Sequence, residues 1–269
     1  MAFSATGSTS AKDTVERLRR ELRQWERPLV HSRQNGIVSS GVAVLDNLLP
    51  DFGIGAGELV EWQSGRGCGA VSLVMLQLRA VLDVQSAGMA IVIDSPGTFS
   101  PMGAALLGVD LNRLIIIRPR SANQAVWVME QCLRCSGVAA VCGRLGAISE
   151  TSARRLKLAA RTGGGVGLFL RDEAVGLQRA SSWSDVRWRV EPVAVPADQN
   201  HFRDAFAGRR LQVELVSCRT GRAGRTVEID ICDETGLVRE APRVASATGQ
   251  KPFPLPQNRR RNKHFQRTG

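Results

Sequence analysis

GELVEWQSGRGCGAVSLVMLQLRAVLDV, residues 57–84, is the stretch that decides the fold. Its first six residues predict a strand, residues 63–69 form a glycine-rich loop, and residues 70–84 predict a mostly buried helix. Backbone N–H groups of such a loop, together with the start of the helix, favour anions. The phosphates of a nucleotide would therefore sit between this strand and this helix.

The residues that follow continue the alternation of strands and helices. Apolar runs predict buried strands and periodic segments predict helices, in the order strand 89–95, strand 111–119, helix 121–137, strand 138–143, helix 150–165 and strand 166–172. Ser121 is the expected N-cap of its helix and Gly137 lies near its expected end. The glycines at 163–165 are expected to cap the next helix at its C-terminus. Such alternation implies βαβ crossovers and a mostly parallel sheet.

The pattern changes after residue 172. Residues 183–193 and 209–232 alternate with period two, and TGRAG at 220–224 predicts a hairpin in the second stretch. We therefore expect an α/β fold with a mostly parallel sheet flanked by helices, and antiparallel strands extending one edge. The expected organisation is an N-terminal helix and linker (1–36), a core with the C-terminal hairpin (37–240) and a basic disordered tail (241–269).

The glycine-rich loop lacks the side chains that bind phosphate and metal. Against the pattern G-x-x-x-x-G-K-[ST], Ala70 stands at the lysine and Val71 at the metal-binding hydroxyl residue. Alanine and valine supply neither the charge nor the hydroxyl, so we predict no nucleotide cofactor and no turnover. Arg66 is the one cation inside the loop. The window that matches is Ser64, Gly65, Arg66, Gly67, Cys68, Gly69, Ala70, Val71 and Ser72.

The net charge of +11 and the pI of about 10.5 favour polyanionic partners, most often nucleic acid. More than half of the excess lies in residues 249–269, which hold no acidic residue, and Phe253 and Phe265 there could stack on bases. We predict weak binding of single-stranded DNA by this tail; the alternative is a solvated tail that aids solubility. The cations are Lys251, Arg259, Arg260, Arg261, Lys263 and Arg267.

Residues 13–26 predict an amphipathic helix whose apolar stripe is Val15, Leu18, Leu22 and Trp25. A narrow stripe of this kind suits docking onto another protein, and packing on the chain's own core is the alternative. Residues 28–40 are expected to be a linker. Six cysteines without a secretion signal, and no run of 18 apolar residues, predict a cytoplasmic chain with no membrane span.

The cysteines and histidines suggest neither a metal site nor a nucleophile. Cys132 and Cys135 have C-x-x-C spacing, and Cys142 follows in an apolar strand, but a fourth ligand with paired spacing is missing. We therefore expect small buried side chains and no metal. The three histidines fall in linker or tail stretches, and no hydrolase motif is present.

Several segments resemble the RecA family: IVSSGVAVLDNLL (37–49), GIGAGELVEW (53–62), AIVIDSPGTFSP (90–101) and GVDLNRLIIIRP (108–119). The resemblance covers roughly residues 37–172 and implies a RecA-type ATPase fold. It also exposes three departures. Ala70 replaces the loop lysine, Pro96 stands at the catalytic glutamate, and Cys142 stands where a magnesium-orienting aspartate ends the strand. Three losses together argue against ATP turnover.

Within this family the chain looks most like the accessory proteins of bacterial SOS mutagenesis cassettes. The features are LLPDFGIGAGELVE (48–61), the eroded loop, and a hairpin followed by DETGLVR (233–239). The resemblance implies a non-catalytic scaffold in translesion synthesis. Its implied partners are an inactive Y-family-like polymerase and an error-prone replicative-type polymerase. The N-terminal helix suggests RecA or another copy of the chain as further partners, and the basic tail suggests single-stranded DNA. A divergent DNA-stimulated ATPase and an SOS cell-division inhibitor are the alternatives.

Overall fold

The computed structural model describes residues 36–65, 67–172, 183–194, 208–219, 223–232 and 235–241. Its main feature is one nine-stranded sheet with the strand order β11-β10-β9-β8-β3-β7-β6-β4-β5. The strands are β3 (Leu59–Ser64), β4 (Met89–Ile93), β5 (Leu114–Ile117), β6 (Val138–Arg144), β7 (Val166–Asp172), β8 (Val186–Pro192), β9 (Gly208–Cys218), β10 (Arg225–Cys232) and β11 (Val238–Glu240). A separate two-stranded sheet joins β1 (Ile37–Val38) to β2 (Ile54–Gly55).

The six strands from β8 to β5 run parallel to their neighbours. Strands in the centre of this group, such as β3 and β7, are buried along most of their length. Continuous apolar runs are the expected sequence of parallel strands that are covered on both faces. The predicted mostly parallel sheet is therefore confirmed.

The C-terminal strands add the antiparallel edge. β9 and β10 pair antiparallel from Gly208↔Cys232 to Leu215↔Arg225, and β11 pairs antiparallel with β10. This confirms the predicted hairpin. The period-two stretch at 183–193 was expected to pair antiparallel with both of its neighbours, and the structure differs from this for one of the two. β8 is parallel to β3 and antiparallel only to β9, so it is the strand at which the sheet changes direction.

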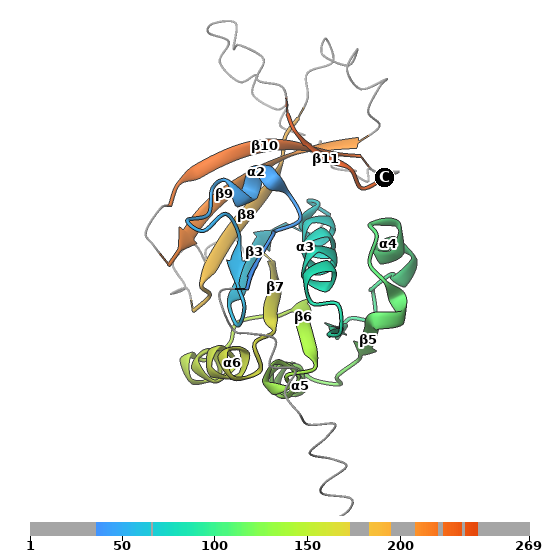
Figure 1. The fold of residues 1–269 in the computed structure, drawn as a ribbon, viewed down its shortest axis with the longest axis vertical. Helices are drawn as coiled ribbons and strands as arrows, with labels where there is room; N and C mark the ends of the chain where they lie inside the picture. Colours follow the sequence, from blue (N-terminus) through green and yellow to red (C-terminus); the bar gives the residue numbers. More distant parts are fainter. Residues whose placement is uncertain are drawn as a thin grey trace, which may run out of the picture.

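Helices cover the parallel part of the sheet on both faces (Figure 1). α3 packs with α4 on one face, and α5 contacts α6 on the other. Stacked Trp62 and Trp188, with ring centroids 5.7 Å apart, lie in the core under α3. Phe169 meets Trp183 edge to face under α6. The helices are α2 (Ala43–Asp46), α3 (Ala70–Val84), α4 (Pro101–Leu106), the 3-10 turn η1 (Leu111–Arg113), α5 (Ala122–Arg134) and α6 (Glu150–Gly163).

The helix ends follow local capping chemistry. The Ser121 hydroxyl accepts the Gln124 amide at the start of α5, as predicted. α6 ends at Gly163, and Gly164 adopts a φ of 84°, a left-handed conformation that suits glycine. α5 ends at Arg134, before the expected Gly137, because the next residue, Cys135, is already extended.

The segment expected to be a linker partly belongs to the fold. Ile37 and Val38 form β1, and Ser40 is 1% exposed. The Asp46 carboxylate accepts the Ser40 amide at 2.7 Å and the Ser39 hydroxyl at 2.5 Å, which fixes this segment against α2. The linker interpretation of residues 37–40 is therefore wrong, because short-range bonds to Asp46 order a stretch whose composition resembles a loop.

A buried charge cluster lies in the middle of the sheet. The Glu61 carboxylate on β3 is fully buried, 3.1 Å from Arg171 on β7 and 3.4 Å from Arg187 on β8. The Ser184 hydroxyl donates to the same carboxylate at 3.2 Å. Buried charges of this kind are tolerated only when paired, so the cluster ties three neighbouring strands together.

No helix among the described residues is long and apolar enough to cross a membrane.

Candidate functional site

The glycine-rich loop lies at the carboxyl end of β3, between a buried Ser64 and the first turn of α3. Gly67 and Gly69 have φ angles of 79° and 86°, so the loop needs glycine at both positions. The Gly69 carbonyl accepts the Ser72 amide at 3.0 Å and so starts the helix. The predicted strand, loop and helix are present, with the helix bounds as expected.

The two positions that should carry phosphate and metal chemistry hold apolar side chains. Ala70 is 2% exposed and packs into the core, whereas Val71 is 47% exposed on the first turn of α3. Neither offers a charge or an oxygen ligand to a bound triphosphate. Ser72, one position later, carries the nearest hydroxyl in α3.

The end of β4 lacks a general base at the expected place. Pro96 follows the buried Asp94, whose carboxylate is already engaged. The Asp94 carboxylate accepts a hydrogen bond from the Thr98 amide at 2.9 Å and lies 3.3 Å from the Arg118 guanidinium. Asp94 therefore orders the turn into α4, and Pro96 has no group that could activate water.

The end of β6 is equally unsuited to hold magnesium. Cys142 is 2% exposed, and burial raises the pKa of its thiol to about 12. Gly143 follows, and a Cβ there would lie 3.0 Å from the Ile93 carbonyl oxygen, so this position tolerates little more than glycine. Arg144 ends the strand and forms an ion pair with Asp172 at the end of β7. The last residue of this strand is therefore a cation, whereas a magnesium ion would need an oxygen ligand.

An apolar pocket of about 290 Å³ occupies the space between α3, α4 and the ends of β4 and β6. Pro96 and Cys142 both line it, so two of the three departures from an ATPase face one cavity. Its lining also includes the side chains of Val71, Met75, Val92, Phe99, Ala104, Leu107 and Leu170. Ser72, Asp94, Thr98, Ser100 and Arg144 also line it, but most of the lining surface is apolar, so the pocket suits apolar groups.

Two residues of β9 reach the loop, and sequence reasoning missed both. The Arg209 guanidinium donates to the Ser72 hydroxyl at 3.4 Å, which brings a second cation beside the loop in addition to Arg66. Leu211 lies against Gly69. The contacts join residues more than a hundred positions apart, and the only sequence signal was the period-two pattern that placed β9 in the sheet. Arg66 itself lies outside the described residues.

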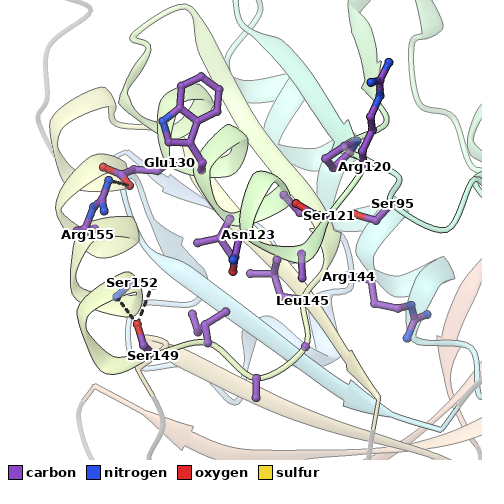
Figure 2. A pocket seen from close by; sticks show the side chains of 18 residues that line it. Ser95, Arg120, Ser121, Asn123, Glu130, Arg144, Leu145, Ser149, Ser152 and Arg155 are labelled. Carbon is purple, nitrogen blue, oxygen red and sulfur yellow. Dashed lines mark hydrogen bonds and ion pairs between the residues drawn. The ribbon is translucent and has the colours of Figure 1, made fainter.

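A second pocket, of about 570 Å³, lies where α5 and α6 begin (Figure 2). The N-caps of both helices, Ser121 and Ser149, line it. Figure 2 shows Arg120 and Arg144 along one side and the Glu130–Arg155 ion pair, at 2.8 Å, on the other. Two converging helix starts and neighbouring guanidinium groups favour anions.

An exposed aromatic ring borders the same pocket. Trp127, on α5, is 56% exposed and belongs to the lining. A large aromatic side chain beside cations is a common arrangement where proteins contact single-stranded nucleic acid. Sequence reasoning did not single out Trp127 or Arg120, because the pocket forms only when two helices separated in sequence lie side by side.

Two of the other predicted sites cannot be compared with the loop. The apolar stripe of the N-terminal helix and the cations of the tail lie outside the described residues. Cys142 is buried inside β6 as expected, and Cys132 is half-buried at the end of α5. The expectation of a buried side chain is wrong for Cys135, which is exposed where the helix has ended. Among the residues that the structure describes, no group of three His, Cys, Asp or Glu side chains is placed to hold a metal ion.

Comparisons with known proteins agree with this architecture. The model of the RecA N-terminal domain matches residues 29–148. ImuA of Caulobacter vibrioides is 28% identical over 200 residues, which cover 70% of this chain and 81% of that protein. RecA of Chlorobaculum tepidum is 24% identical over 237 residues, covering 75% of this chain and 66% of that protein.

The fold is also found in a solved structure. A crystal structure of the RadB recombinase superposes with a TM-score of 0.57 at 15% identity, and the match covers 77% of this chain and all of that one. At such low identity the superposition speaks for the fold alone. Sequence and fold agree: the chain has a RecA-type fold and is similar to ImuA over most of its length.

Proposed function

We propose that the chain is a non-catalytic, RecA-like accessory protein of SOS mutagenesis that docks the polymerases of translesion synthesis. The likeness to ImuA and RecA supports the association with the DNA-damage response. The observation that carries the non-catalytic part is the apolar pocket. It brings Pro96 and Cys142 together beside Val71, where an ATPase would place its acidic and hydroxyl groups.

The partners that this proposal names are an inactive Y-family-like polymerase and an error-prone replicative-type polymerase, with RecA as a further one. The docking element is the N-terminal amphipathic helix with its stripe of Val15, Leu18, Leu22 and Trp25. Large aromatic residues such as Trp25 dominate the energy of many interfaces. The stripe therefore supplies the type of surface that a scaffold needs, without any chemistry at the loop.

Two measurements test the proposal. Phosphate release should stay at background with and without single-stranded DNA, and turnover that disappears in Arg66→Ala or Arg209→Ala would instead favour a divergent ATPase. In a pull-down with both polymerases, Leu22→Asp/Trp25→Ala should lose association while its melting temperature is unchanged. A loss of melting temperature with association intact would show that the helix belongs to the core. Capture of cell-division proteins in place of polymerases would favour a division inhibitor.

We also infer a contact with single-stranded DNA at the pocket between α5 and α6. Arg120 and Trp127 support it, because they place a cation and an exposed aromatic ring beside two helix starts. Phosphate contacts would position the strand and base stacking would hold it, without sequence preference. The basic tail would then add to the affinity.

Binding of a fluorescent oligonucleotide separates the two sources of affinity. Arg120→Ala/Trp127→Ala should weaken binding about tenfold or more, since stacking contributes about 1–3 kcal/mol per base. Arg79→Ala is the matched control, because Arg79 is an exposed cation on α3, on the other face of the sheet. Unchanged affinity in the double variant would remove this pocket as the contact.

A further inference from the structure

We propose that the apolar pocket between α3 and α4 holds a segment of the chain's own C-terminal end, residues 252–256. The sequence of this segment is Pro-Phe-Pro-Leu-Pro. The pocket has a volume of about 290 Å³. That volume is at the lower end of sites that hold a small ligand, and it suits one or two apolar side chains. The inference does not depend on the polymerase partners or the DNA contact proposed above.

The pocket has apolar surface to offer at its mouth as well as inside. Val71, which lines the pocket, is 47% exposed. Elsewhere on α4, outside the lining, Met102 and Leu106 are 69% and 63% exposed. Burial of apolar surface stabilises by about 25 cal/mol per Å². An occupant with two apolar side chains would therefore gain by burying them in the cavity and against the exposed Val71.

The C-terminal strand leads away from the wall of this pocket. Gly236 is buried against Leu107, a residue of the pocket wall: a Cβ at 236 would lie 2.4 Å from the Leu107 Cδ2. Leu237 follows and is 61% exposed. The described chain then ends at Ala241, only a short strand beyond this contact.

The chain beyond Ala241 is long enough for residues 252–256 to reach back to the pocket. Phe253 lies twelve residues beyond Ala241, and an extended chain covers about 40 Å over that length. The five residues from Gly236 to Ala241 span at most about 17 Å. The segment can therefore reach the pocket without rearrangement of β11.

The composition of the segment suits binding in which only its side chains enter the pocket. Phe253 and Leu255 are its two large apolar residues, and a proline flanks each of them on both sides. Proline fixes φ near −65° and removes the N–H donor, so such a stretch is extended before it binds and needs no strand partner. Docking then costs little conformational entropy, and the two side chains are presented to the cavity.

Methyl NMR on the full chain labelled at methionine tests the proposal. Met75 lines the pocket, whereas Met129 is buried on the opposite face of the sheet and is the internal reference. Phe253→Ala/Leu255→Ala should move the Met75 methyl signal by more than its linewidth and leave Met129 in place. Phe265→Ala, in the same tail, is the matched control and should move neither.

Two further measurements complete the test. A peptide of residues 249–258 should return the Met75 signal of the double variant in a saturable titration, and the same peptide with both alanines should not. Gly103→Leu fills the pocket, because a Cβ at 103 meets only Ser100, at 3.5 Å or more; in this background the tail substitutions should no longer move Met75. A Met75 signal that is identical in the natural and double-variant tails, or that moves only when a separate protein is added, would overturn the proposal.

Discussion

Leu211 on β9 lies directly against Gly69 in the glycine-rich loop, so that a Cβ at 69 would stand 2.6 Å from the Leu211 Cδ1. The same glycine has a φ of 86°. Gly69→Ala should therefore lower the free energy of unfolding for two reasons. The left-handed backbone costs about 1–2 kcal/mol, and the collision of the new Cβ with Leu211 adds to this loss. Chemical denaturation measures the sum.

A double-mutant cycle separates the two causes. Leu211→Ala alone should cost about 2–5 kcal/mol, as usual for a buried leucine. Because it removes the colliding atoms, the double variant should lose less than the sum of the two single losses. Strict additivity would show that the contact between Leu211 and the loop is unimportant.

Restoring the loop residues should not restore ATP turnover. Ala70→Lys/Val71→Thr rebuilds the lysine and hydroxyl positions, but Pro96 and Cys142 still leave the site without a general base or a metal-orienting carboxylate. We expect phosphate release at background, with circular dichroism to show that the variant is folded. Turnover in a folded double variant would mean that the other two positions are dispensable.

The buried pair of Glu61 and Arg171 should carry much more stability than an exposed pair of the same type. Arg171→Ala leaves a fully buried carboxylate without one of its partners, so the loss should be about 3 kcal/mol. Arg154→Ala is the control: it breaks a pair with Glu150 in which both side chains are more than three-quarters exposed, and should cost about 0.5 kcal/mol or less. Equal losses in urea denaturation would contradict the assignment.

The thiols of Cys135 and Cys142 should differ sharply in reactivity. Cys135 is exposed, whereas burial raises the Cys142 pKa from 9.0 to about 12, so the Cys142 thiol stays protonated at pH 8 and unreactive. A thiol-specific dye should label Cys135 rapidly and Cys142 only after unfolding. Peptide mapping by mass spectrometry identifies the labelled residue, and Cys135→Ser is the control.

The same shift has a consequence for stability at alkaline pH. The folded chain binds the Cys142 proton more tightly than the unfolded chain, so the contribution to stability is complete below pH 9 and is lost as pH rises towards about 12. Cys142→Ala removes this term. Its melting temperature should therefore fall less steeply than that of the natural chain as the pH is raised above 9.

Affinity for single-stranded DNA should fall steeply with salt, because the tail cations release condensed counterions on binding. Removal of residues 249–269 deletes six cations and should reduce the slope of log affinity against log salt by several units. Anisotropy titrations over a range of salt concentrations measure both slopes. An unchanged slope would place the contacts elsewhere in the chain.

Local sequence patterns predicted where helices and strands form better than they predicted how the strands pair. The bounds of α3 and β7 follow from the apolar runs at 70–84 and 166–172, since these residues are buried by the layers they build. α4 was not expected, because PMGAAL is short and contains a glycine; Pro101 at its first turn and the Ser100 cap make it a helix. The direction of β8 could not be predicted, because period two is the same for parallel and antiparallel pairing.

The candidate site was predictable only where it is continuous in sequence. Ala70 and Val71 follow directly from the loop motif, and Pro96 and Cys142 from the resemblance to RecA. The apolar pocket that joins Val71, Pro96 and Cys142 depends on how α4 lies beside α3. Arg209 beside Ser72 and Trp127 beside Arg120 arise from contacts between distant elements, for which one sequence holds no signal.

The pairing of β3 also sets the order in which the chain can be built. Leu59 and its neighbours pair with β7 on one side and with β8 on the other, and both strands are encoded roughly 100 residues or more downstream. At a synthesis rate of about 5–20 residues per second, β3 waits roughly 5–20 s on the ribosome before its first sheet partner exists. During that interval an apolar strand and the glycine-rich loop after it have no sheet to join. The growing chain is therefore exposed to aggregation, and to chaperones, during that interval.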